Sequence, residues 1–510
     1  MANNTIDMQD FLKQIEGKLN KMDVIPKSEN VGKVLSVGDG IVKVSGLSQA
    51  GFGEEVQFED KTAGLVFNLD EDVASIILLS DSSKIVEGSK VATTGKILGI
   101  NASDSLLGRV IDPLMTPLDG KTLNTQKSKF YPLEKIAPGV IERSPVDTPL
   151  KTGIKAIDSM IPIGRGQREL IIGDRNTGKT AIAIDTIINQ NKKDLGLPQV
   201  ICIYCSIGQK RGNVARTVAT LSANDALSYS IVVTASASDS PALQYLAPFT
   251  ATSIGEYFMD QGKDVLIIYD DLSKHAWAYR QISLLLRRPA GREAYPGDIF
   301  YLHSRLLERS SRMSEKYGGG SITSFPIIET QADDISAYIP TNVISITDGQ
   351  IYLKTDLFNS GTRPAIDAGL SVSRVGGAAQ TKGMKQFSGP LRLDLAQYRS
   401  LAAFAQFGSD LDEQTQKQLD RGKRIAEILK QPQYKPFDEA SQIISIYAAT
   451  TGLLDDLPVE KIIIFEDKVH DYIRIKNKKL IARLSSKEKM DEATQTELKK
   501  EVEAFLKTLK

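Results

Sequence analysis

Residues 170–190 read LIIGDRNTGKTAIAIDTIINQ, and this stretch decides the fold of the central part of the chain. Its first three residues form a short apolar run typical of a buried strand, and residues 181–190 are mostly apolar and favour a helix. The loop between them matches G-x-x-x-x-G-K-[ST], the pattern of phosphate-binding loops, which requires this order of strand, loop and helix. We therefore expect a nucleotide site here. The eight loop residues are Gly173, Asp174, Arg175, Asn176, Thr177, Gly178, Lys179 and Thr180.

The chemistry of such a loop gives each part a role. Backbone N–H groups surround the phosphates, Lys179 adds a positive charge, and the following helix points its positive end inward. Thr180 offers its hydroxyl to Mg²⁺. Mg²⁺ prefers hard oxygen ligands, so we expect a carboxylate at the end of another buried strand, where Asp270 follows the apolar run 265–269. The alternative is that Asp270 and Asp271 only cap the helix that begins near residue 272.

A neutral side chain stands where a hydrolytic site needs a carboxylate. The next apolar strand after the loop helix leads to Gln209, an amide. An amide can hydrogen-bond an attacking water but cannot take its proton near neutral pH. The sequence therefore predicts a site that binds a nucleotide and hydrolyses it poorly.

The chain is expected to have several domains. Apolar positions at helical spacing predict an amphipathic helix over residues 1–25. Short alternating runs, about six in number, predict an antiparallel β-barrel over 26–95. Strands alternating with helices predict an α/β P-loop (RecA-like) nucleotide-binding domain over 96–380. Its expected strands include 201–206, 231–234, 265–269 and 342–346.

The C-terminal part, residues 381–510, predicts an α-helical bundle. Its expected helices are 391–407, 412–429, 437–450 and 459–475. The last stretch, 486–510, is strongly charged and carries a narrow apolar seam. Two interpretations are open for it, a surface helix and a solvated helix without a partner. The seam residues are Leu498, Val502, Phe505, Leu506 and Leu509.

Composition limits the class of protein. Sixty-three basic and 63 acidic residues cancel, which argues against a nucleic-acid partner. No apolar run could span a bilayer and no secretory or transit signal is evident, so we expect a cytosolic chain held at a membrane by partners. Cys202 and Cys205 would point to opposite faces of one strand and are expected to be buried hydrophobes. The histidines at 275, 303 and 470 lie far apart and predict no metal site.

Six motifs carry a family resemblance that covers essentially the whole chain. They are PIGRGQRELIIGDRNTGK at 162–179, LIIYDD at 266–271, YRQISLLLRR at 279–288, GREAYPGDIFYLHSRLL at 291–307, ISITDGQ at 344–350 and SVSRVG at 371–376. With the order of barrel, phosphate-loop domain and helical tail, they resemble the alpha subunits of rotary F-type ATP synthases.

The resemblance implies a ring of three alpha and three beta subunits, with catalytic sites mainly on beta and non-catalytic sites mainly on alpha. It implies that the loop and Gln209 bind ATP or ADP with Mg²⁺, and that Asp270 holds the metal through water. It further implies a gamma subunit in the ring centre, a delta subunit or peripheral stalk on the N-terminal helix, and a place at the cytoplasmic face of the cell membrane. The remaining residues implied around the nucleotide are Phe358, Arg363, Gln431 and Gln433.

Arg374, within SVSRVG, is the residue through which the resemblance implies a part in catalysis. It would reach into the neighbouring beta site as an arginine finger. A guanidinium is always charged, and its planar fork of donors suits the oxygens of a transferring phosphoryl group. Without the resemblance, an exposed arginine after a strand is more often a solvated charge.

Three positions depart from the family pattern. Asn176 stands where Gln is usual, and His275 and Trp277 stand where Gln and Val are usual. Asn176 shortens a side chain over the nucleotide, and Trp277 is expected to fill packing space. Two other classes compete with the resemblance, an alpha-like paralogue acting as a motor ATPase and a hexameric RNA-translocating ATPase. Gln209 argues against the first, and the balanced charge argues against the second.

Overall fold

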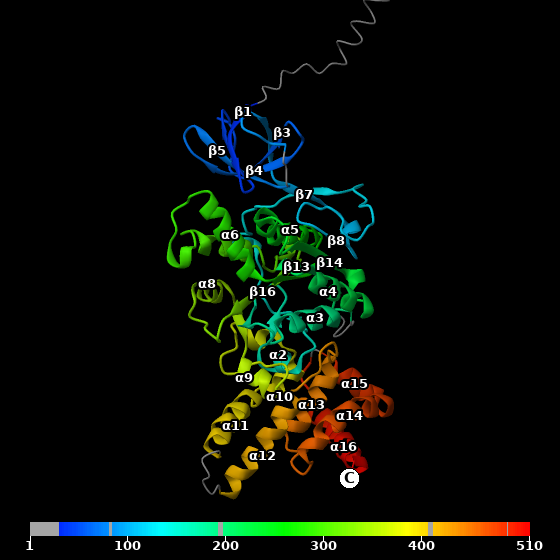
Figure 1. Cartoon of the computed structure of the whole chain (residues 1–510). Coiled ribbons are helices and arrows are strands. Elements are labelled where there is room, and N and C mark those ends of the chain that lie inside the picture. The colour runs from blue at the N-terminus through cyan, green and yellow to red at the C-terminus, as the bar shows by residue number, and fades with distance from the viewer. Residues whose placement is uncertain (1–29, 81–83, 192–196, 406–411, 487, 510) are drawn as a thin grey trace, which may run out of the picture. The chain divides into compact units, whose positions relative to one another are not determined.

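The computed structural model describes residues 30–80, 84–191, 197–405, 412–486 and 488–509. The chain forms two compact units, Met1–Ile97 and Leu98–Lys510, and each is described by itself (Figure 1). The helix expected at 1–25 lies outside the described residues. The domain boundaries expected at residues 95 and 380 remain predictions.

The first unit is a closed antiparallel barrel of six strands in the order β1-β2-β5-β4-β3-β6, as predicted. Asp39 and Gly40 form the two-residue turn between the first two strands, both with positive φ, the conformation whose twist matches such strands. Alternate side chains such as Val42, Val44 and Ile76 fill the barrel. The strands are β1 Val31–Gly38, β2 Ile41–Ser45, β3 Glu54–Phe58, β4 Ala63–Leu69, β5 Val73–Leu78 and β6 Lys90–Ile97.

The second unit is built on an eight-stranded sheet in the order β18-β17-β12-β16-β15-β13-β14-β8. Every neighbouring pair is parallel except β17 with β18. Cys202 and Cys205 are buried, free thiols on β13, as predicted. The strands are β8 Val110–Ile111, β12 Leu170–Asp174, β13 Ile201–Gln209, β14 Ser230–Ser236, β15 Asp264–Asp270, β16 Ser321–Thr330, β17 Gly349–Leu353 and β18 Val372–Ser373.

One predicted strand is wrong. Residues 342–346 belong to helix α8, Tyr338–Ile346, and the strand follows as β17. The buried residues Ile339, Val343 and Ile346 recur at helical spacing. Five residues of which three are apolar cannot distinguish the two periods, and the helical face becomes visible only when Ile339 is included.

Helices cover this sheet. Helix α5 packs against β13, β14 and β15, and α3 packs against β12, β15 and β16. Most residues of both helices are buried. The helices of this part are α2 Lys155–Met160, α3 Lys179–Asn189, α4 Arg211–Ala223, α5 Pro241–Met259, α6 Leu272–Leu285, α7 Ile299–Leu307, α8 and α9 Thr355–Asn359.

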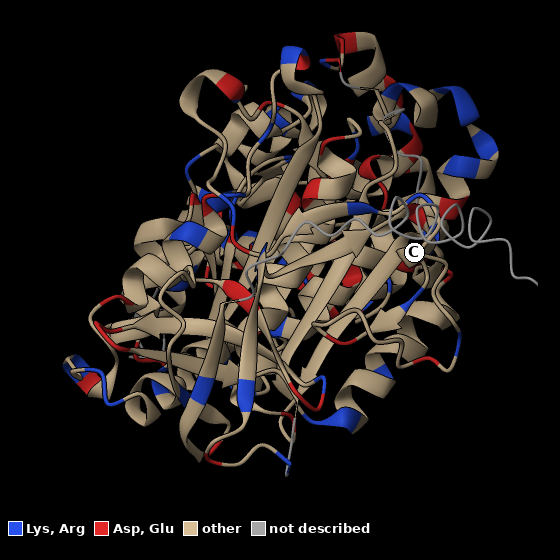
Figure 2. Cartoon of the chain, turned by 90° about the horizontal axis from the view of Figure 1, so that it is seen from above, with Lys and Arg blue, Asp and Glu red and all other residues tan. Residues whose placement is uncertain are grey.

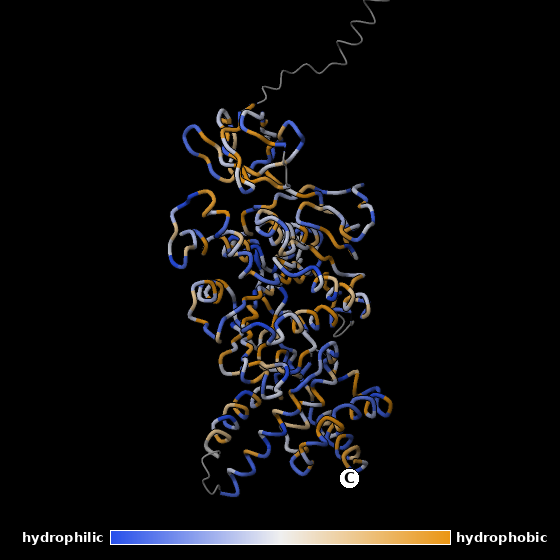
Figure 3. The backbone as a smooth tube through the Cα atoms, viewed as in Figure 1, coloured by the Kyte–Doolittle hydropathy of each residue, from blue (hydrophilic) through white to orange (hydrophobic). Residues whose placement is uncertain are grey.

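The C-terminal helices share one hydrophobic core with the sheet domain. Hydrophobic and hydrophilic residues alternate along these helices in Figure 3. Leu498, Val502 and Phe505 are buried, and α16 packs against α14, so the last stretch is a docked surface helix and the interpretation as a solvated helix is wrong. The helices are α10 Lys382–Ser388, α11 Leu391–Ala405, α12 Glu413–Ile428, α13 Glu439–Thr450, α14 Ile462–Lys476, α15 Lys478–Leu484 and α16 Glu492–Leu509.

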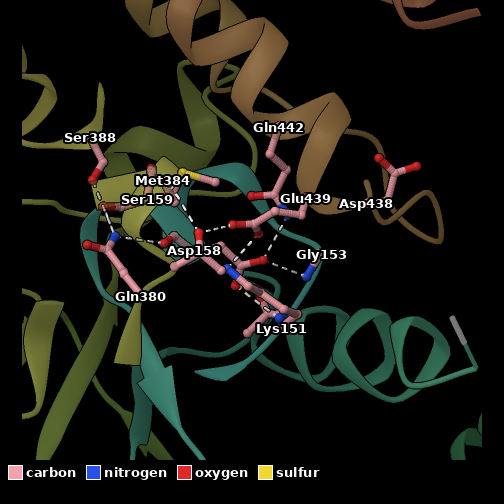
Figure 4. Close-up of polar contacts among 12 residues, drawn as sticks. Lys151, Gly153, Asp158, Ser159, Gln380, Met384, Ser388, Asp438, Glu439 and Gln442 are labelled. Carbon is pink, nitrogen blue, oxygen red and sulfur yellow. Dashed lines mark hydrogen bonds and ion pairs between the residues drawn. The ribbon is translucent and has the colours of Figure 1, made fainter. Parts of the chain in front are cut away.

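A buried polar network joins α13 to the start of the nucleotide domain (Figure 4). The Asp158 carboxylate accepts hydrogen bonds from Thr152 N at 2.9 Å, Gly153 N at 3.0 Å and Gln442 Nε2 at 2.8 Å. Lys151 forms an ion pair with Glu439 at 2.6 Å. Because its charges are paired and the Asp158 carboxylate is well bonded, this network fixes the residues that precede the phosphate loop relative to the helical part.

Charge and apolarity are distributed without a dominant face or span. Basic and acidic residues are both spread over the ribbon in Figure 2, in keeping with a net charge of zero. Within the described ranges, no helix combines the length and the apolarity that a membrane crossing requires.

Candidate functional site

The phosphate loop leaves the carboxyl end of β12, an interior strand, and enters α3 at Lys179. A Cβ atom on Gly173 would lie 2.4 Å from the carbonyl oxygen of Leu353, so only glycine fits there. Gly178 has a φ of 103° and Asn176 a φ of 64°. Asparagine tolerates this left-handed region better than most side chains, so Asn176 suits the loop backbone.

Lys179 is buried at the start of α3 and bound to the loop itself. Its Nζ donates to the carbonyl oxygens of Gly173 at 2.7 Å and Asp174 at 2.5 Å. Burial lowers the pKa of Lys179, while nearby carboxylates, first Glu329 and then Asp271, act in the opposite direction. A bound phosphate would give this buried cation an anionic partner.

The structure brings together the two residues predicted to hold the metal. Thr180 Oγ1 donates to Asp270 Oδ2 at 2.8 Å, and Tyr204 OH donates to the same oxygen at 2.7 Å. A hydroxyl and a carboxylate are the oxygen ligands that Mg²⁺ prefers. Over the described residues, no group of three or more His, Cys, Asp or Glu side chains forms a metal cage. The donor set therefore fits Mg²⁺ held jointly with phosphates and water, and its binding stays a prediction.

The two neighbouring aspartates have different roles. Asp271 caps α6, because its Oδ1 accepts from Lys274 N at 2.8 Å and the Lys274 ammonium pairs with its other oxygen. Burial raises the pKa of Asp271 to about 6, and Lys274 opposes this rise. Asp270 instead faces the loop. Capping thus explains Asp271 alone.

Gln209 lies at the end of β13 and faces the aspartates. Its Nε2 donates to Asp270 Oδ1 at 3.0 Å and to Asp271 Oδ2 at 3.4 Å. The amide therefore stands beside the expected metal site as a hydrogen-bond donor, in a place where it cannot accept a proton from water near neutral pH.

A cavity of about 380 Å³ adjoins the loop and gathers the four residues that the family resemblance implied around the nucleotide. The Arg363 guanidinium lies 4.4 Å from the centre of the Phe358 ring. A mostly apolar cavity of this size with few polar groups suits a ribose and a base. The lining residues are Ile154, Thr177, Gly178, Ala181, Ile182, Asp185, Phe358, Arg363, Pro364, Gln431, Pro432 and Gln433.

The two glutamines of this group differ in what they can offer a ligand. Gln431 is buried, and its amide donates to the carbonyl oxygens of Gly153 at 2.8 Å and Lys435 at 3.0 Å. Its Oε1 accepts from Lys155 N at 3.1 Å. Gln431 therefore holds the cavity wall in place, whereas Gln433 is exposed.

Asp185 was missed by the sequence analysis. It lies on α3, lines the cavity and is 6% exposed. The signal available in the sequence was a single carboxylate within the apolar helix AIAIDTIIN. Aspartate and glutamate are seldom fully buried unless they are paired.

Arg374 lies at the other end of the sheet from the loop. β18 pairs Ser373 with Gly349, the first residue of β17, whereas Gly173 pairs with Leu353, the last residue of that strand. The Arg374 side chain is exposed, and no hydrogen bond or ion pair joins its guanidinium to a described residue. The structure therefore does not bring Arg374 together with the other predicted site residues.

Two expectations about side chains need correction. His275 and His303 are neighbours in space, with Nδ1 of the first 3.3 Å from Nε2 of the second, because α6 and α7 meet in the core. Burial lowers the pKa of both, that of His303 to about 3. Trp277 was expected to fill packing space, but it is 41% exposed, because its α6 neighbours Ala276 and Ala278 face the core.

Three family models match the chain. Residues 27–95 match the beta-barrel domain of the ATP synthase alpha/beta family, residues 153–373 match its nucleotide-binding domain, and residues 380–505 match the C-terminal domain of the ATP synthase alpha/beta chain. Two curated relatives are each called ATP synthase subunit alpha. The protein of Dehalococcoides mccartyi is 53% identical over 98% of this chain and 99% of its own length. That of Aquifex aeolicus is 54% identical over 98% of both chains.

Proposed function

Because this chain belongs to the alpha-subunit family of F-type ATP synthases, we propose that its own nucleotide site is non-catalytic and that Arg374 completes the site of a neighbouring beta subunit. Family membership makes the chain part of an ATP-binding complex that couples ATP synthesis or hydrolysis to ion transport. The proposal adds that this chain's own site does not catalyse the reaction and that the site on beta does.

The single observation that carries the non-catalytic role is the position of Gln209. Its amide donates to Asp270 beside Thr180, at the place where a hydrolytic site needs a proton acceptor. Lys179, Thr180 and the loop backbone supply what binding of Mg-ATP needs. The site is therefore equipped to retain a nucleotide, and at the position of Gln209 it carries an amide that cannot activate water by taking its proton.

Arg374 supports the second part of the proposal. Its exposed guanidinium forms no hydrogen bond or close ion pair with a described residue, and its charge acts on the buried Glu169 carboxylate. It lies near the start of β17, about 13 Å of strand away from the end that meets its own loop. Such a cation cannot serve the nucleotide of its own chain. A neighbouring subunit docked on this edge would place its phosphates within reach.

The proposed assembly is an alternating ring of three alpha and three beta subunits around a gamma subunit, at the cytoplasmic face of the cell membrane. The segment 1–25 is proposed to dock a delta subunit or peripheral stalk. Apolar side chains on the second unit support burial by protein partners, since Ile136, Val140 and Ile141 are 92%, 89% and 85% exposed.

Replacement of Lys179 tests the proposal. In a reconstituted complex, Lys179→Gln should weaken nucleotide retention on this subunit by at least about tenfold, because a charge-assisted contact to phosphate contributes roughly 1.5–3 kcal/mol. Steady-state ATP hydrolysis should remain within about threefold of the parent, since the proposed catalytic sites lie on beta. Retained nucleotide and turnover are measured on the same preparation.

Lys500→Gln, an exposed change on α16, serves as the matched control. Assembly is checked by size-exclusion chromatography. If turnover collapsed in an intact Lys179→Gln complex, the site on this chain would have to be catalytic.

A further inference from the structure

The carboxylate of Asp185 lines the nucleotide cavity and is hydrogen-bonded to the described residues through one oxygen only. Its Oδ1 accepts a hydrogen bond from Tyr434 N at 2.7 Å. Within the described part of the chain, no donor bonds Oδ2 and no cation pairs with the group, although the residue is 94% buried. The carboxylate thus holds the turn at Tyr434 with one oxygen and turns an open acceptor toward the cavity.

Apolar side chains surround the unbonded oxygen of Asp185. Apolar groups of Ile154, Ala181, Ile182 and Pro364 form the walls beside Asp185. Burial raises the pKa of Asp185 to about 7, while the Tyr434 N–H acts in the opposite direction. Oδ2 is not among the fully buried atoms without a partner, so it is open to the cavity. A base that fills the cavity would cut Oδ2 off from solvent, so a ligand that brings an N–H to this oxygen would be selected over one that does not.

The other polar side chains named in the buried lining are hydrogen-bonded to the protein or can only donate. Thr177 Oγ1 donates to the carbonyl oxygen of Asp174 at 2.8 Å, and the Gln431 amide is bound to the backbone. Arg363 is a donor that lies over the Phe358 ring. Asp185 is thus the carboxylate in the described lining, and its unbonded Oδ2 is a stronger acceptor than the Thr177 hydroxyl or the Gln431 amide oxygen, which are already bonded to the protein.

The position of Asp185 along α3 indicates which part of a nucleotide it meets. It follows Lys179 by six residues, a helix rise of about 9 Å. Gly178, Ala181, Ile182 and Asp185 recur at helical spacing and line one cavity. A ribose and base that extend along this face from phosphates at Lys179 would bring a base edge to Asp185.

We propose that Asp185 determines base selectivity, with Oδ2 accepting a hydrogen bond from the exocyclic amino group of adenine. This inference rests on the nucleotide site proposed above and adds the residue that reads the base. A carbonyl group in place of the amino group would set two acceptors against each other, which disfavours hypoxanthine in the same pose.

Two triphosphates that differ from ATP at one position test the proposal on the full chain. Purine riboside triphosphate lacks the amino group, and ITP carries a carbonyl in its place. At about pH 8, where a carboxyl of pKa near 7 is mostly ionised, ATP should bind at least about tenfold more tightly than purine riboside triphosphate. Equilibrium dialysis gives the dissociation constants.

Asp185→Asn sharpens the test, because it keeps an oxygen for Tyr434 N–H and offers an NH₂ group to the cavity. The variant should lose the preference for ATP over purine riboside triphosphate and should bind ITP more tightly than the parent does. Asp356→Asn removes a charge from exposed α9 without altering the cavity lining and should leave every ratio unchanged. Because the readout is a ratio of affinities, a general loss of stability cannot imitate it.

The outcomes separate this inference from the proposed function. Equal binding of ATP and purine riboside triphosphate by the parent would overturn the role of Asp185 while leaving the nucleotide site intact. Tighter parent binding of ITP or GTP than of ATP would also overturn it, since the carboxylate would then read a different base edge. Failure of the parent to bind any triphosphate would contradict the proposed nucleotide site itself.

Discussion

Three aspartates around the loop helix differ in role because their hydrogen-bond partners differ. Asp270 accepts from Thr180, Tyr204 and Gln209 and is fixed beside the loop. Asp271 caps the next helix, and Asp185 has one backbone donor and one open oxygen. The same type of side chain thus lies at the expected metal site, at a helix cap and at the cavity, according to where each strand or helix places it.

The buried histidine pair predicts a loss of stability in acid. Burial holds His275 and His303 neutral in the folded chain, whereas unfolded histidine takes up a proton near pH 6.5. Their contribution is therefore fully present above about pH 6.5 and is lost as pH falls, by up to about 1.4 kcal/mol per pH unit for each histidine.

His275→Gln should accordingly reduce the drop in Tm between about pH 7.5 and about pH 5.5, because one neutral buried base is removed. Trp277→Val is the control, since it changes a neighbouring position without a titratable group. Calorimetric scans at the two pH values measure the difference. An unchanged pH dependence in His275→Gln would show that the pair does not govern acid sensitivity.

Some site residues could be predicted from the local sequence pattern, and others could not. The loop, Thr180 and the acid at 270 were predictable because a strand, a loop and a helix place them by short-range rules. The contact between His275 and His303 depends on how α6 and α7 pack, which sequence spacing does not reveal. The role of Asp185 depends on Tyr434, 249 residues away.

At the scale of elements, helix α16 shows how an apolar seam decides docking. Leu498, Val502 and Phe505 recur at helical spacing and are buried against α14, where Phe505 meets the rings of Phe465 and Tyr472. The polar face of α16 remains in solvent. The helix is therefore held by its seam, because its sequence is otherwise strongly charged.

Leu498→Ala should destabilise the C-terminal part by about 2–5 kcal/mol, since it removes a fully buried side chain and leaves a cavity. Lys500→Ala, on the exposed face of the same helix, should change stability by less than about 0.5 kcal/mol. Urea unfolding followed by circular dichroism compares the two. Similar midpoints for both variants would contradict a docked α16.

Strands and helices were predicted correctly where the spacing of apolar residues and the turn residues indicated the same structure. The barrel strands are short runs separated by turn residues, β1 and β3 alternate in burial, and Asp39-Gly40 specifies the first hairpin, so all six strands were predictable. The prediction for residues 342–346 failed because a five-residue segment with three apolar residues satisfies a strand and a helix alike. The helical period there becomes evident only with the buried Ile339 included.

The whole molecule carries parts of two sites at opposite ends of one sheet. The phosphate loop lies at the carboxyl end of β12, and Arg374 follows β18 near the start of β17. In the first, Gln209 is an amide that cannot take a proton from water. Arg374, at the other end, is the cation that we propose acts on a nucleotide of the neighbouring subunit. This arrangement favours a subunit that binds one nucleotide and acts on another held by its neighbour.

ATP turnover of a reconstituted complex carrying Arg374→Ala tests whether Arg374 acts on the nucleotide of a neighbouring subunit. An arginine finger contributes on the order of 10³ to 10⁵ in rate, whereas a surface ion pair contributes at most about 1 kcal/mol. Arg374→Lys should recover little, because an ammonium keeps the charge but loses the planar fork. Arg216→Ala, an exposed change on α4, is the control.

Arg374→Ala should leave assembly and nucleotide binding on this chain intact while steady-state turnover falls by about a thousandfold or more. The Arg216→Ala complex should keep the parent rate. An assembled Arg374→Ala complex that turns over within about threefold of the parent would contradict the claim, because Arg374 would then be an ordinary surface charge.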